Sequence, residues 1–134
     1  MPDPYRVGLA GCGRMGATID DEVIARDKEN QIRWLPYSHA AVVKACARAQ
    51  LVAVADPFED KAETIRARYE VGSAYTDFEE MIRKEELDIL CIATRPGPHA
   101  EIAVFAAESG VRGIVCEKPL CNSMRQADDM LAAC

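Results

Sequence analysis

The stretch that decides the fold runs from Tyr5 to Gly16 and reads YRVGLAGCGRMG. Its first six residues are mostly apolar, which is typical of a buried β-strand. Gly11, Gly13 and Gly16 follow in the pattern G-x-G-x-x-G, and the residues after them are compatible with a helix. A strand, a glycine turn and a helix in this order open a βαβ unit. The stretch therefore predicts a parallel α/β fold.

Each glycine of this pattern has its own steric task. The first allows a tight turn, the second lets the backbone approach a diphosphate, and the third lets the helix pack closely on the strand. Free amides at the helix start attract phosphate oxygens. We predict that this loop, including Arg14 and Met15, binds a dinucleotide. An incidental glycine turn is the alternative, and Arg14 fits a phosphate contact, an adenine contact or a solvated position.

Apolar runs alternate with segments of helical period along the rest of the chain. Strands are expected at 5–10, 51–55, 89–93 and 111–116, with a short one at 73–75. Helices are expected at 58–69 and from Pro98 to Ala107. Two more helices should follow the capping boxes at Thr76–Glu79 and Ser123–Gln126. This order predicts a Rossmann-type, doubly wound parallel sheet in three α/β/α layers. We expect the fold to be truncated before its last strand and before a second domain.

Composition excludes several classes of function. The 134 residues carry a formal net charge of −6 and suit one domain, residues 1–134. An acidic chain without a basic cluster argues against nucleic acid or a membrane as partner. The six cysteines lack metal-binding spacing, so we expect no metal site and reduced thiols. The N-terminus does not resemble a signal peptide, which favours a cytoplasmic location.

Asp56 ends the second apolar run, where an acidic residue accepts hydrogen bonds from the adenosine ribose. Its charge would repel a 2′-phosphate, so we predict NAD in preference to NADP; a turn-capping role before Pro57 is the alternative. Asp56 follows Gly16 at about twice the usual spacing of roughly 20 residues. The excess is an insertion at about 20–38, either an inert excursion or a lid or interface element, and exposure of Trp34 would favour the latter.

Two further segments follow later strands and should reach the same sheet edge. Thr94 can offer a hydroxyl to a cofactor, and His99 either binds there or bonds locally at a helix start. Lys118 can donate a hydrogen bond to a reacting hydroxyl, or act as a base when deprotonated. Its neighbour Glu117 would oppose this unless directed elsewhere, for instance at ribose hydroxyls. His39 is expected to be an ordinary helix or loop residue.

The segments VGLAGCGRMG, LVAVADP, YTDFEEMI, LDILCIAT and CEKPL together resemble the Gfo/Idh/MocA family of oxidoreductases. The resemblance covers nearly the whole chain, but only the N-terminal domain of that family. It implies an NAD(P)-binding Rossmann domain followed by a substrate domain, and we expect these 134 residues not to include the latter. The family lysine falls on Lys118 and its glutamate on Glu117. Arg95 and Pro96 stand where many members have Pro-Asn.

The resemblance implies hydride transfer between a nicotinamide cofactor and a sugar, cyclitol or related polyol. The full-length protein is expected to form a homo-oligomer, whereas this 134-residue chain alone is expected to be inactive. A non-catalytic dinucleotide-binding sensor or interaction module is the alternative. A methyltransferase-like Rossmann domain is a weaker one, because the third glycine and the Glu-Lys-Pro tripeptide argue against it.

Overall fold

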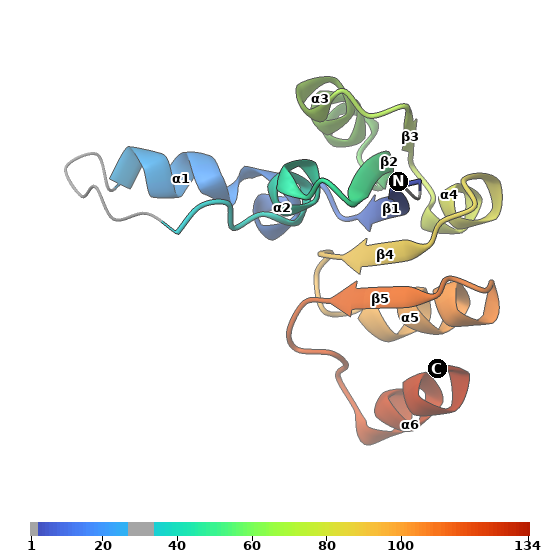
Figure 1. The fold of residues 1–134 in the computed structure, drawn as a ribbon. Helices are drawn as coiled ribbons and strands as arrows, with labels where there is room; N and C mark the ends of the chain where they lie inside the picture. The colour runs from blue at the N-terminus through green and yellow to red at the C-terminus, as the bar shows by residue number, and fades with distance from the viewer. Residues whose placement is uncertain (1–2, 27–33) are drawn as a thin grey trace.

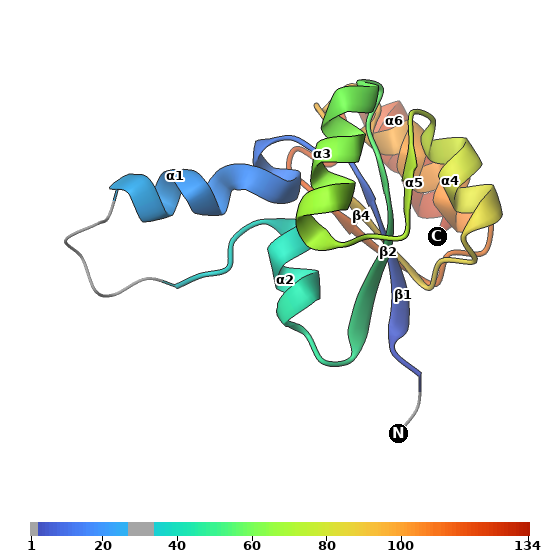
Figure 2. The same cartoon turned by 90° about the horizontal axis from the view of Figure 1, so that it is seen from above.

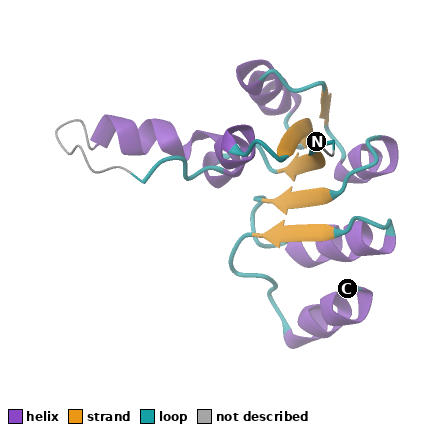
Figure 3. Cartoon of the chain, in the orientation of Figure 1, coloured by secondary structure: helices purple, strands orange, loops and turns teal. Residues whose placement is uncertain are grey.

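The computed structural model describes residues 3–26 and 34–134. In these two ranges one parallel sheet is formed, and its strands are β1 (Tyr5–Ala10), β2 (Ala49–Ala55), β3 (Ser73–Tyr75), β4 (Ile89–Ile92) and β5 (Gly113–Cys116). Their order across the sheet is β3-β2-β1-β4-β5 (Figures 1 and 3). Within the described ranges this is the doubly wound order without a sixth strand, as the sequence predicts. No described helix is long and apolar enough to cross a membrane.

Helices cover both faces of the sheet, as crossover connections between parallel strands require. They are η1 (Arg14–Thr18), α1 (Ile19–Arg26), α2 (His39–Ala45), α3 (Glu59–Tyr69), α4 (Phe78–Lys84), α5 (His99–Glu108) and α6 (Met124–Ala133). Figure 2 shows α2 and α3 on one side and α4 and α5 on the other, with α6 beside α5. The predicted three-layer α/β/α fold is therefore confirmed.

Alternating strand residues build the two halves of the core. In β1, Leu9 packs with residues of α2 and α3, whereas Ala10 packs with residues of α4 and α5. This follows from the period of two in a strand, which sends successive side chains to opposite faces. Leu90 of β4 is likewise completely buried. Burial on both faces explains why the strands appear in the sequence as nearly continuous apolar runs.

Several predicted boundaries shift slightly. β2 begins two residues earlier than predicted, and β5 begins at Gly113 because Val111 still donates its amide to Ala106 O at the end of α5. The capping box at Thr76 is wrong, since Asp77 is the N-cap of α4 and accepts the amide of Glu79 at 2.9 Å. Aspartate is the stronger capping residue. The predicted cap of α6 is confirmed, because Ser123 accepts the amide of Gln126.

The insertion forms an arm, defined here by the described residues 19–26 and 34–38. Helix α1 projects beyond the carboxyl edge of the sheet, in the direction in which β4 and β5 point (Figures 1 and 2). Arg68 of α3 holds it through two 2.7 Å hydrogen bonds to Asp21. Residues 27–33 of the predicted insertion lie outside the described residues. Trp34 is 79% exposed, which favours a lid or interface element over an inert excursion, and this role stays a prediction.

Candidate cofactor-binding site

A cleft of about 980 Å³ opens at the carboxyl edge of the sheet. It lies where β1 is flanked by β2 and β4, the switch point at which doubly wound sheets bind ligands. Most of the predicted site residues line it, namely Gly11, Gly13, Arg14, Met15, Asp56, Thr94, Glu117 and Lys118. Two predicted residues, Gly16 and His99, lie outside the lining. Segments far apart in the sequence are thus brought together as predicted.

The glycine loop shows why the first and third positions need glycine. Gly11 has a φ of +99°, and a Cβ there would lie 2.5 Å from the carbonyl carbon of Ala93. A Cβ on Gly16 would lie 2.0 Å from Gly11 O. By contrast, a Cβ on Gly13 would meet nothing within 4 Å. The chain's own packing therefore excludes side chains at Gly11 and Gly16, while Gly13 leaves open space for a ligand.

The helix start beside this space offers backbone donors. Gly13 is the N-cap of η1, whose residues have π-helical hydrogen bonding, and the amide of Ala17 donates to Gly13 O at 2.9 Å. The amides of a first helical turn have no partner within the helix, so they are available to an anion. Arg14 stands in the same turn, with its Nε 2.7 Å from the carboxylate of Glu22. These donors and the open space at Gly13 fit a diphosphate.

Asp56 braces the glycine loop from the end of β2. Its Oδ2 accepts the amide of Cys12 at 3.0 Å and its Oδ1 accepts the amide of Phe58 at 3.0 Å. The side chain is only 8% exposed. The bond to Phe58 is the turn-capping role left open by the sequence. Because each carboxylate oxygen can accept more than one hydrogen bond, the predicted ribose contact remains compatible with it.

Cys12 plays a passive part in the loop. Burial, with a smaller contribution from the charge of Asp56, raises the pKa of its thiol to about 12. A thiol with such a pKa is protonated near neutral pH and is a poor nucleophile.

The Glu117-Lys118-Pro119 tripeptide follows β5 directly. Its backbone is tied to the sheet, since the amide of Glu117 donates to Ile92 O at 2.9 Å. The Lys118–Pro119 peptide bond is cis. Lys118 is exposed at the rim of the cleft. It therefore stands where the sequence places it, at the carboxyl edge of the sheet and open to solvent.

His99 bonds locally, which is one of the two alternatives that the sequence left open. Its side chain is completely buried, with Nδ1 2.8 Å from Pro119 O and Nε2 3.1 Å from Thr94 O. Both ring nitrogens thus face backbone carbonyls, and the ring lies behind the lining of the cleft. These contacts favour the local alternative over a direct cofactor contact, and they place His99 between two loops that line the cleft. The first turn of α5 gives the ring this reach.

Some residues of the site were not predicted. His39, treated as an ordinary residue, places its Nε2 2.9 Å from Glu117 Oε1. Phe58 and Lys61 line the cleft beside Asp56, with the Lys61 ammonium 4.9 Å from the centre of the Phe58 ring. Arg95 lines it as well. Phe58 and Arg95 could have been predicted, because each follows the carboxyl end of a strand. By contrast, no local sequence pattern indicates that His39 contacts Glu117.

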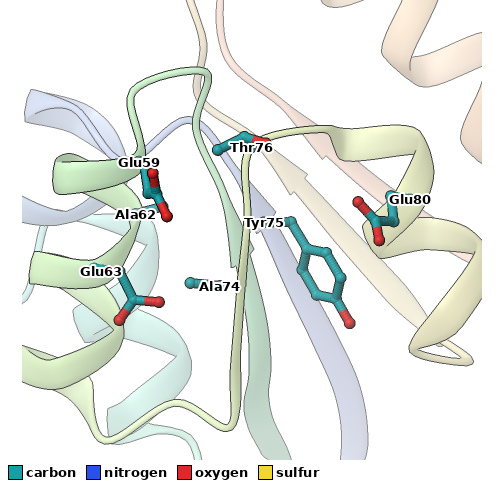
Figure 4. A pocket seen from close by; sticks show the side chains of 7 residues that line it. All are labelled: Glu59, Ala62, Glu63, Ala74, Tyr75, Thr76 and Glu80. Atoms are coloured by element: carbon teal, nitrogen blue, oxygen red, sulfur yellow. The ribbon is translucent and has the colours of Figure 1, made fainter.

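A second, smaller hollow lies between α3, β3 and α4 (Figure 4). Its volume is about 230 Å³, and Glu59, Glu63 and Glu80 contribute carboxylates to its lining together with Tyr75. Three acidic side chains disfavour a phosphate there. We therefore assign the cofactor site to the larger cleft.

Comparison with known proteins agrees with this geometry. The profile of the oxidoreductase family with an NAD-binding Rossmann fold, Gfo/Idh/MocA, matches residues 5–134. The chain belongs to the Gfo/Idh/MocA family. The Gfo/Idh/MocA match includes all five strands and both ends of the cleft.

Individual members of the Gfo/Idh/MocA family show the same relation. The myo-inositol 2-dehydrogenase of Thermotoga maritima is 27% identical over 94% of this chain and 31% of its own length. The inositol 2-dehydrogenase of Rhizobium meliloti is 31% identical over 86% of this chain and 28% of its own. The WlbA dehydrogenase of Bordetella pertussis, solved with NADH and UDP-GlcNAcA, has a TM-score of 0.73 and is 26% identical. That match covers 98% of this chain and 34% of the WlbA chain. The chain thus spans about a third of its relatives.

Proposed function

We propose that this chain is the NAD(P)-binding part of an oxidoreductase that transfers a hydride between a nicotinamide cofactor and a CH–OH group of a sugar, cyclitol or related polyol. The observation that carries the proposal is the cleft, in which the glycine loop, Asp56 and Lys118 meet at one sheet edge. The names of the inositol dehydrogenase relatives support the substrate class.

Each part of the cleft has a task in this proposal. The open space at Gly13 and the amides of the first helical turn bind the diphosphate. Asp56 accepts hydrogen bonds from the adenosine ribose. The bound nicotinamide supplies or takes up the hydride. Lys118 donates a hydrogen bond to the oxygen of the reacting carbon, and as a neutral amine it can take the proton of a substrate hydroxyl.

We further propose NAD as the preferred cofactor. The carboxylate of Asp56 would lie close to a 2′-phosphate and repel it. Arg14 and Lys61 line the same cleft and would partly offset this repulsion, so the preference is expected to be moderate. Homo-oligomeric assembly of the full-length protein and a cytoplasmic location stay predictions from the sequence.

Titration with NADH and NADPH tests the proposal. We expect micromolar binding of NADH, weaker binding of NADPH, and a shift toward NADPH in Asp56→Ala. If the substitution acted only through loss of the hydrogen bond to the Cys12 amide, it would weaken the binding of NADH and NADPH equally. The ratio of the two affinities therefore isolates the ribose contact. Asp60→Ala is the control, since it removes a nearby exposed carboxylate that does not line the cleft. A folded chain that binds neither cofactor would refute the proposal.

A further inference from the structure

The chain's two histidines both contact the Glu117-Lys118-Pro119 tripeptide, one at each end. His99 holds the carbonyl of Pro119, and His39 holds the side chain of Glu117. We propose that His39 is a positioning residue, which orients the Glu117 carboxylate toward the nicotinamide half of the cofactor and keeps it from pairing with Lys118. This inference rests on the proposed function, which assigns the cleft to a dinucleotide.

His39 is itself held firmly at the root of the arm. It is the first residue of α2, directly after the N-cap Ser38, whose hydroxyl accepts the amide of Ala41 at 3.3 Å. Buried Asp20 of α1 accepts the amides of Tyr37 and Ser38, at 2.6 and 3.2 Å, and the hydroxyl of Ser38. The direction in which the His39 ring leaves the backbone is thus set by a buried polar cluster and not by the exposed part of the arm.

The contact between His39 and Glu117 is well shielded. The two side chains are 13% and 22% exposed, and the Nε2–Oε1 distance is 2.9 Å. An ionised carboxylate only accepts hydrogen bonds, so Nε2 carries a proton and donates it. One donor uses one of about four acceptor positions on a carboxylate. Glu117 therefore keeps acceptor capacity on the side where it lines the cleft.

The order of residues along the cleft indicates what those acceptors meet. Asp56 and Lys61 lie after β2, and the glycine loop lies after β1. Glu117 and Lys118 lie after β5, on the other side of β1 in the sheet. A dinucleotide with its diphosphate at the glycine loop and its adenosine near Asp56 extends its second ribose toward Glu117. Hydroxyl groups of that ribose are the donors that a carboxylate fixed by His39 is arranged to accept.

The same contact affects the lysine. Adjacent Glu117 is the nearest carboxylate in the sequence to Lys118, yet within residues 3–26 and 34–134 the side chain of Glu117 is hydrogen-bonded to His39. Lys118 forms no ion pair in this described part of the chain. Its ammonium group is thus left for the substrate oxygen, as the proposed reaction requires.

Two ligands separate positioning from a merely structural role. NADH reaches Glu117, whereas ADP lacks the second ribose and ends at the glycine loop. We expect His39→Leu to weaken NADH binding about tenfold, the effect of losing one hydrogen bond to a charged group, and to leave ADP binding within twofold. His39→Gln should restore most of the NADH affinity, because its amide nitrogen can replace Nε2 as the donor.

Lys44→Leu is the matched control. It removes a polar contact of α2 to Tyr69 O, away from the cleft, and should change neither affinity. If His39→Leu fails to fold, a double-mutant cycle of His39→Asn with Glu117→Ala, read out as NADH affinity, replaces it. The asparagine side chain is too short to reach Glu117, so we expect strong coupling between the two substitutions. Unchanged NADH affinity, equal loss of NADH and ADP, or zero coupling overturns the inference. A wild-type chain that binds neither ligand instead refutes the proposed function.

Discussion

Replacing Gly16 by alanine should destabilise the fold strongly. The new Cβ would lie 2.0 Å from Gly11 O, whereas carbon and oxygen atoms in contact are about 3.3–3.6 Å apart. The obstructing atom belongs to the backbone, and Gly11 is fixed by the hydrogen bond that its amide donates to Ala55 O at 2.8 Å. There is no flexible side chain that could move aside. The helix start and the strand must therefore separate by roughly 1 Å or more, although the surrounding core is tightly packed.

The magnitude follows from two opposing effects. Overpacking of this kind costs about 1–3 kcal/mol and occasionally more. Alanine in place of glycine gains at most about 1 kcal/mol in helix propensity. Since the clash is with fixed backbone, we place the cost above the usual range, at about 4 kcal/mol. The net loss is then about 3 kcal/mol, which lowers the melting temperature of a domain of this size by about 10 °C.

Thermal unfolding followed by circular dichroism measures this loss, and Gly13→Ala is the matched control. A Cβ on Gly13 meets nothing within 4 Å, so the melting temperature should stay within about 2 °C while NADH affinity falls because the methyl group occupies the space for the diphosphate. The reasoning is refuted if Gly16→Ala melts like the wild type, or if Gly13→Ala is the less stable variant.

The remaining predictions concern single side chains. In a longer form that contains a substrate domain, Lys118→Met should lower turnover at least about 100-fold with little change in NADH affinity; steady-state kinetics and titration check both. Burial raises the pKa of Asp20, but the hydrogen bonds from Ser38 and Tyr37 outweigh it and leave the pKa below the ordinary 3.8. Asp20 therefore stabilises the fold above pH 3.8 and loses this contribution as pH falls through its lower folded pKa, so the destabilisation by Asp20→Asn in urea unfolding should shrink at acid pH. Buried Cys12, with a pKa of about 12, should resist iodoacetamide in the folded chain, whereas exposed Cys46 should react; equal rates would contradict this.

Features that depend on local pattern could be predicted from the sequence. The strands could be recognised because burial on both faces requires continuous apolar runs, and the glycine loop because its sterics admit no other residue at Gly11 and Gly16. The meeting of Asp56, Thr94 and Lys118 in one cleft followed from a general property of parallel sheets, whose carboxyl ends share an edge.

Features that depend on long-range contacts could not be predicted. His39 and Glu117 are 78 positions apart, and nothing near either residue indicates the other. The first turn of α5 suggested that His99 was near the site, but only the packed loops decide that its ring faces two carbonyls and not the cleft. The direction of α1 is equally non-local, since Arg68 of α3 holds it.

The bond between Asp20 and Ser38 gives the arm a closed base. The chain leaves the Rossmann layer and returns to it at one point. The pairing of the strands therefore does not depend on how many residues lie between Asp20 and Ser38. For a flexible loop, each doubling of length costs only about 0.6 kcal/mol in closure entropy. Segments of different length can therefore be exchanged at this position, by evolution or by design, without altering the register of β1 and β2. Such segments would stand beside the carboxyl edge of the sheet, where the cleft lies.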